Sequence, residues 1–285
     1  MSELEAYKDL CKKQGNLLRK DFYFGSLFLV KFGVARGPYK FSGRLSENEP
    51  GASYPLYLSG WQQYTKEEWS LKAKKASDGS LRIALDLFPK KYENLKVKAQ
   101  YRQISGNPSI GFEYLHSKAR ANCEVTSGSA HCNLVFGSRK FGFGTEGLID
   151  YNTLKPSLTS IACWWVHKHS RLVLKHENVD SNTISLGKFD VSLYQKVDSN
   201  TKFAANAKID CVGKALDIEA GGENKWNATT TGKWKIDSSG KIALALKKQW
   251  SNNLTSVFSA ETSSESLKNH AFRDSKFGIR LNIDQ

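Results

Sequence analysis

The chain has 285 residues, enough for one large domain or two ordinary ones, and it is basic, with 42 Lys and Arg residues against 28 Asp and Glu residues and a formal net charge of +14. This charge predicts an acidic partner, and the main classes are nucleic acid, an anionic membrane surface and small anions. The five cysteines are odd in number, widely spaced and without a CxxC pair, so they argue against a disulfide framework or a structural zinc site and predict free thiols in a reducing compartment.

The first predicted element is a short, basic amphipathic helix within the first 20 residues. One face is expected to carry Leu4, Tyr7, Leu10, Gln14, Leu17 and Leu18, with Lys8, Lys12, Lys13 and Arg19 between them. Such a face packs on a core, plugs the mouth of a barrel or anchors on a membrane surface. The opening residues resemble neither a secretory signal nor an Arg-rich transit peptide.

From about residue 24 onward, apolar residues alternate with polar ones, and this period of two predicts β-strands. The alternation is clear over 81–87, 95–102, 189–197, 203–210, 242–246 and 276–283. Turn signals such as Asp78-Gly79 and Ser239-Gly240 separate the strands, and no composition break divides the chain. The pattern therefore predicts one all-β domain, either a sandwich or a barrel.

The composition of the strand faces favours a membrane barrel. Apolar faces are paired with faces dense in Lys, Arg and Asn, which suits lipid outside and water inside. Mean hydropathy is −0.48 and no stretch approaches the roughly 20 apolar residues of a membrane helix, but a barrel exposes only every second residue to lipid. Aromatic residues near strand ends fit interfacial girdles: Trp61, Tyr64, Trp69, Tyr101, Tyr114, Trp226, Trp234 and Trp250. A soluble β protein stays open as the alternative, since Trp and Tyr are enriched in strands of any kind.

Two motifs resemble ligand sites but lack the context that such sites need. Residues Gly142 to Gly147 spell GxGxxG, yet no helix follows, so we expect a tightly packed glycine-rich strand instead of a dinucleotide site. His167, His169 and His176 have no cysteine or acid at ligand spacing, so lumen-lining imidazoles are expected instead of a metal site. No catalytic constellation stands out, and we predict neither an enzyme nor a cofactor.

The segment Lys233-Trp234-Lys235 combines basic and aromatic residues, as in proteins that bind single-stranded nucleic acid. In a strand, however, the ring and the two lysines lie on opposite faces. The ring then cannot stack on a base whose phosphate the lysines hold, and no nucleic-acid partner is expected.

Three segments of the chain carry motifs of one known family. The first is Tyr7-Lys8-Asp9-Leu10, with Lys12, Lys20 and Phe22-Tyr23-Phe24-Gly25; the second is Ser192-Leu193-Tyr194-Gln195-Lys196-Val197; the third is the last segment, with Lys276, Gly278, Leu281 and Ile283. These segments resemble the mitochondrial porins, the voltage-dependent anion channels. The first is similar to the family's opening, in which a Y-x-D-L-x-K helix leads into the first strand, the second to its S-x-Y-Q-K-V strand, and the third to the β-signal read by the outer-membrane insertion machinery.

The resemblance covers essentially the whole chain and implies a transmembrane barrel of about 19 strands over residues 24–285, preceded by an amphipathic helix and linker over residues 1–23. The helix is expected inside the lumen, with Leu10, Leu17 and Leu18 packed on an apolar patch. Tyr7, Asp9 and Leu10 are the expected gating residues. Gly15 lowers helix stability by about 1 kcal/mol relative to Ala, so the helix is expected to be docked yet able to loosen.

The implied function is a voltage-gated, anion-favouring channel for passive diffusion of ATP, ADP, phosphate and organic anions across the mitochondrial outer membrane. Cations on the predicted lumen faces lower the barrier for anions. They are Lys96, Lys98, Lys196, Lys208, Lys233, Lys235 and Arg280, to which the resemblance adds Lys12 and Lys20. The expected partners are outer-membrane lipids, the insertion machinery, and further copies of the chain or a larger mitochondrial complex.

Two other functions stay open. The chain could be a porin-like structural subunit of a larger mitochondrial assembly, with an occluded lumen. It could also be the related protein-translocating barrel of the outer membrane, which ranks third because that family usually has a longer N-terminal extension and lacks the S-x-Y-Q-K-V strand.

Overall fold

The computed structural model describes residues 4–24, 28–47, 56–90, 94–103, 108–153, 156–177, 187–269 and 275–284, and within them nineteen strands form one sheet. The strands are β1 (Phe28–Arg36), β2 (Tyr39–Glu47), β3 (Leu56–Thr65), β4 (Trp69–Ala76), β5 (Leu81–Leu87), β6 (Leu95–Arg102), β7 (Ser109–Leu115), β8 (Ala119–Val125), β9 (Ser129–Gly137), β10 (Phe141–Asp150), β11 (Pro156–His167), β12 (Ser170–Glu177), β13 (Lys188–Lys196), β14 (Thr201–Asp210), β15 (Ala215–Lys225), β16 (Thr230–Asp237), β17 (Lys241–Gln249), β18 (Leu254–Ser263) and β19 (Lys276–Asp284). The helices are η1 (Tyr7–Asp9), α1 (Lys12–Arg19) and α2 (Ser264–Lys268). None of the described helices is long and apolar enough to cross a membrane.

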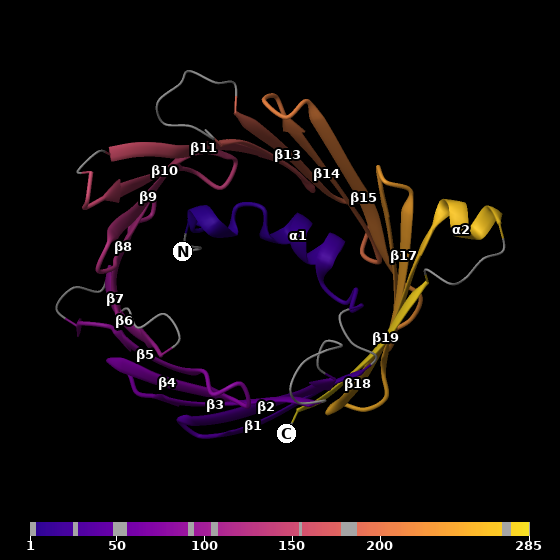
Figure 1. The fold of residues 1–285 in the computed structure, drawn as a ribbon, viewed down its shortest axis with the longest axis horizontal. Coiled ribbons are helices and arrows are strands. Elements are labelled where there is room, and N and C mark those ends of the chain that lie inside the picture. The colour runs from indigo at the N-terminus through magenta and orange to yellow at the C-terminus, as the bar shows by residue number, and fades with distance from the viewer. Residues whose placement is uncertain are drawn as a thin grey trace.

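The sheet closes into a barrel (Figure 1). Each strand pairs antiparallel with its neighbour in the chain, and β1 completes the ring by pairing parallel with β19, where Phe28 lies opposite Ile279 and Phe32 opposite Ile283. An odd number of alternating strands requires this parallel pair, because the first and last strands then run in the same direction. Closure leaves no open sheet edge. The expected barrel of 19 strands is confirmed.

The strand register assigns each side chain to the lumen or to the outer surface, because directly opposed residues on neighbouring strands share a face. Helix α1 packs on Ala204, which marks the face of Ala204 as the lumen side. Following the register around the ring from Ala204 places Lys96 and Lys98 inside, and Leu95 and Val97 outside. The alternation predicted from the sequence is therefore the alternation between lumen and lipid faces.

The N-terminal segment lies inside the ring of strands, nearer to β11 and β13–β15 than to β1–β6 (Figure 1). Its Leu10, Leu17 and Leu18 are only 3%, 4% and 2% exposed. Burying one leucine contributes about 1.5–3 kcal/mol, so these three contacts suffice to hold a short helix against the wall. The expected position of the helix inside the lumen is confirmed.

The prediction that all cysteines are free is wrong for one pair. Cys123 of β8 and Cys132 of β9 form a disulfide on the outer face. They lie directly opposite each other, with their Cα atoms 4.1 Å apart. A sequence separation of 9 matches no common cysteine motif, and it is the hairpin register of β8 and β9 that brings this pair together. Cys11, Cys163 and Cys211 are free thiols.

The predicted lumen position of the histidines is also wrong. The His167 ring stacks on the outward Trp165 with 5.6 Å between centroids, and the His176 ring packs on Phe189 at 4.8 Å, again on the outer face. His169 lies in the turn after β11. The segment 161–167 is apolar on both faces because the inner face of β11 is covered by the N-terminal segment, so it has no alternation from which the faces can be predicted.

Candidate functional site in the barrel lumen

Tyr7 anchors the beginning of the N-terminal segment to the wall. It is 4% exposed, its hydroxyl shares a 2.7 Å hydrogen bond with that of Ser160, and its ring covers Gly144 of β10. A Cβ on Gly144 would lie 2.7 Å from the ring, so a glycine is needed for Tyr7 to dock here. The glycine-rich strand predicted at 142–147 is thus a close-packing strand. The buried cluster around Tyr7 consists of Leu4, Leu10, Val135, Ala162, Trp164 and Val173.

The end of helix α1 has a second apolar anchor. Leu17 and Leu18 pack on Ala204 with the half-buried Tyr194, and a Cβ on Gly221 would lie 3.0 Å from the Leu18 side chain. Between the two anchors, Gln14 is buried at 1% exposure and Gly15 faces open space. Nothing approaches within 4 Å of where a Gly15 Cβ would lie. The buried amide of Gln14 has no hydrogen-bond partner among the described residues.

Beyond the helix, Asp21 ties the linker to the barrel wall. Its carboxylate is 5% exposed, lies 3.0 Å from the Lys233 ammonium and is also paired with Arg280. We call Asp21, Lys233 and Arg280 the linker latch. Burial alone would raise the pKa of Asp21, but the two cations outweigh this effect and hold that pKa below its ordinary value. Asp21 adopts a φ of +79°, a left-handed conformation that Asp tolerates better than most residues.

The linker backbone next passes over Gly278 of β19. The Ser259 hydroxyl donates a 2.8 Å hydrogen bond to the Tyr23 carbonyl and accepts a 3.3 Å bond from the Tyr23 amide. A Cβ on Gly278 would collide with the same Tyr23 carbonyl. Gly278, predicted as part of the insertion signal, therefore also makes room for the linker.

The register places all seven predicted wall cations on lumen faces. Four of these cations form ion pairs with carboxylates. The Lys96 ammonium lies 3.2 Å from Asp86, and Lys98 is paired with Glu113. Lys233 also lies 3.2 Å from Glu223, and Arg280 is paired with Asp21. Lys235 lies 5.7 Å from the centroid of the Phe22 ring. On the helix, Lys12 pairs with Asp9 at 3.3 Å, and Lys20 lines lumen cavities beside the latch. Salt-bridged cations attract a passing anion less strongly than free ones.

Outside the set predicted from the sequence, strands β1–β5 carry six lumen cations. Two of them are Lys40, near the start of β2, and Lys72, which lies 3.8 Å from Asp86. The other four form two opposed pairs. Lys31 is opposite Arg44, and Lys74 is opposite Arg82. No described carboxylate forms an ion pair with any of these four cations. We call them the cationic wall. The same alternation that placed Lys96 inside could have identified the cationic wall, because each of the four occupies an inward position of its strand.

Comparison with known proteins decides the family. The family model described as eukaryotic porin matches residues 5–278. The chain belongs to the eukaryotic porin family. Among solved structures, a triple mutant of the Rhodopseudomonas blastica porin superposes on this porin with a TM-score of 0.52 at 9% identity, covering 90% of this chain and 98% of that one. A double mutant of the same bacterial porin gives 0.51 at 8% identity, with the same coverage. These structures show similarity of fold alone, and no curated protein matches.

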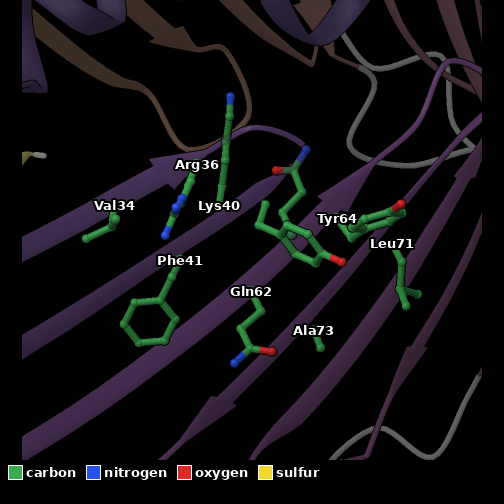
Figure 2. Close-up of a pocket in the computed structure, with 10 residues that line it drawn as sticks. Val34, Arg36, Lys40, Phe41, Gln62, Tyr64, Leu71 and Ala73 are labelled. Carbon is green, nitrogen blue, oxygen red and sulfur yellow. The ribbon is translucent and has the colours of Figure 1, made fainter.

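The outer surface of this porin carries a hollow that is separate from the lumen. Figure 2 shows it over the first four strands, with Phe41, Gln62 and Leu71 among its lining residues. Its volume is about 360 Å³, and Arg36 lies at its edge near the end of β1. Since its lining residues are mostly outward-facing and apolar, the hollow belongs to the outer surface of the barrel and not to the lumen.

Proposed function

We propose that this eukaryotic porin is a voltage-gated, anion-favouring channel through which ATP, ADP, phosphate and organic anions diffuse across the mitochondrial outer membrane. The observation that carries the proposal is the cationic wall, Lys31, Arg44, Lys74 and Arg82, which has no ion-pair partner among the described residues. Fixed charge in a pore lowers the barrier for ions of opposite sign.

Both paired and unpaired cations face the lumen. On the side where the helix docks, some cations are matched by acids, as in Lys202 with Glu223 at 2.6 Å and Lys175 with Glu177 at 2.7 Å, while Lys196, Lys208 and Lys235 have no ion-pair partner among the described residues. On β1–β5 the cations are mostly free, and lumen cavities of about 630 and 530 Å³ lie against them. Because the Debye length is about 8 Å at physiological salt, an anion moving along β1–β5 stays within the field of the cationic wall. These cavities favour an open path over an occluded structural subunit.

The docked helix is the proposed gate. Its two apolar anchors and the linker latch hold it at rest, while Gly15 faces open space and the buried Gln14 amide has no hydrogen-bond partner among the described residues. We infer that a helix held by these few contacts can shift when the voltage changes. Insertion of the barrel is proposed to depend on Lys276, Gly278, Leu281 and Ile283, which the mitochondrial insertion machinery would read. The same resemblance supports the outer membrane of mitochondria as the location.

Planar-bilayer recording of the purified full chain tests this function. The expected result is discrete open-channel steps that close to lower conductance as voltage increases in either direction. A chain that inserts into the bilayer but never conducts would support a structural subunit instead.

A further inference from the structure

Trp61 lies in an unusual place for a barrel tryptophan. The sequence assigned it to an interfacial girdle, but the register sets it opposite Ser42 of β2 and Lys74 of β4, both on the lumen face. Its side chain is 36% exposed. Among the girdle candidates, Tyr64, Trp69 and Trp234 do face outward. Trp61 therefore presents a large apolar ring to the water-filled lumen.

The ring is surrounded by the cationic wall. Lys74 is its direct neighbour across the strand pair, where opposed Cβ atoms lie about 4.5–5.5 Å apart. Arg44 is paired with Ser59, two residues along β3 on the same face, and Lys31 lies beyond Arg44 on β1. The two lumen cavities of about 630 and 530 Å³ share Trp61 and Lys74 in their linings. The ring thus stands where both cavities meet.

This combination has a definite ligand chemistry. Wall cations alone attract any small anion, and an exposed ring adds nothing for chloride or phosphate. A planar aromatic group can stack on the ring, and polyphosphate oxygens can reach Lys74 and Arg44 beside it. Unlike the segment around Trp234, the ring and the cations here share one face, so one molecule can engage both.

We propose that Trp61, Arg44 and Lys74 form a saturable site for nucleoside polyphosphates on the β1–β5 side of the lumen. The site deepens the proposed function, since it adds a resting place for one class of metabolite to a path for anions in general. Trp61 selects for the base, and the two cations hold the phosphates.

Isothermal titration calorimetry of the refolded full chain in detergent micelles at low salt tests the site without requiring conduction. ATP and inorganic tripolyphosphate are compared as ligands. We expect saturable ATP binding that Trp61→Leu weakens roughly tenfold and Trp61→Phe largely retains, as base stacking predicts. Tripolyphosphate binding should be unchanged by Trp61→Leu. Lys74→Gln should weaken the binding of both ATP and tripolyphosphate.

Two results would overturn the inference. One is ATP binding that Trp61→Leu leaves unaltered. The other is an equal loss for ATP and tripolyphosphate in Trp61→Leu, which would mean that the substitution only disturbs the wall. Absence of conductance in a bilayer would refute the channel function and leave these binding results standing, so the two failures are distinguishable.

Discussion

At the scale of single residues, Asp21 matters most for the position of the helix, because it is a buried acid tied to β16 and β19. Asp21→Asn keeps the side-chain volume and removes the charge, which leaves Arg280 without its described ion-pair partner. We expect docking of the N-terminal segment to weaken by on the order of 3 kcal/mol, the low end for breaking a buried pair, since Lys233 retains Glu223. Amide hydrogen exchange over residues 12–19 measures this loss.

Asp9→Asn is the matched control. It makes the same chemical change in the exposed Asp9–Lys12 pair, which contributes at most about 1 kcal/mol. If the amide hydrogens of residues 12–19 exchanged at the same rate in both variants, the linker latch would not be the contact that holds the helix.

The latch also predicts a direction of pH dependence. The pKa of Asp21 is lower in the folded state than the ordinary value of about 4. The stabilisation is therefore fully present at neutral pH and is lost only as the pH falls through the lowered pKa. A spin label at the exposed Lys12 should stay immobile from pH 7 to 5 and gain mobility below pH 4. If Asp21→Asn showed the same gain of mobility below pH 4, the transition would come from the titration of another group.

At the scale of elements, the helix is expected to dock through its apolar face and to move during gating. Leu10 and Val173 belong to one buried cluster. Cysteines at these two positions, in a chain whose five native cysteines are Ser, should cross-link readily under oxidation. Voltage-dependent closure should then disappear and return on reduction. Closure that persists in the cross-linked protein would show that the helix is docked but is not the moving part.

The last strand should carry the insertion signal through its apolar residues. Leu281 and Ile283 lie on the lipid face, so replacing both with Asp should leave the chain unassembled in isolated mitochondria, as judged by carbonate extraction. Asn282→Asp is the control, because it adds one charge on the adjacent lumen-facing position. Gly278 is a poor test residue, since any side chain there displaces Tyr23. Normal assembly of the double variant would argue against the signal.

Sequence reasoning succeeded where apolar and polar residues alternate strictly along a strand with lipid on one face and water on the other. Over 95–102 the alternation gave the correct face for Lys96 and Lys98. It failed over 161–167, where the helix covers the inner face and both faces are apolar. It could not show the latch, because Asp21 and Arg280 are 259 residues apart and meet only after the barrel closes. Lys233 was therefore placed in the lumen correctly, while its neutralisation by Asp21 was missed.

At the scale of the whole molecule, this chain of net charge +14 presents two kinds of cation to its lumen. Some are paired with acids, as are Lys175, Lys202 and Lys233, and others have no described ion-pair partner, among them the cationic wall of β1–β5. Selectivity should therefore depend on the cationic wall more than on salt-bridged cations such as Lys98. The adjacent residues Lys74 and Lys75 provide an internal comparison, because Lys75 faces outward.

The reversal potential of the open channel under a KCl gradient in a planar bilayer tests the central claim most directly. The reversal potential of the wild-type channel should lie closer to the equilibrium potential of chloride than to that of potassium, because the cationic wall has no paired acids among the described residues. Replacing Lys31, Arg44, Lys74 and Arg82 with Gln should move the reversal potential toward that of potassium, and Lys75→Gln should leave it unchanged. A wild-type open state that prefers potassium, or a chloride preference that survives loss of all four wall cations, would contradict the account.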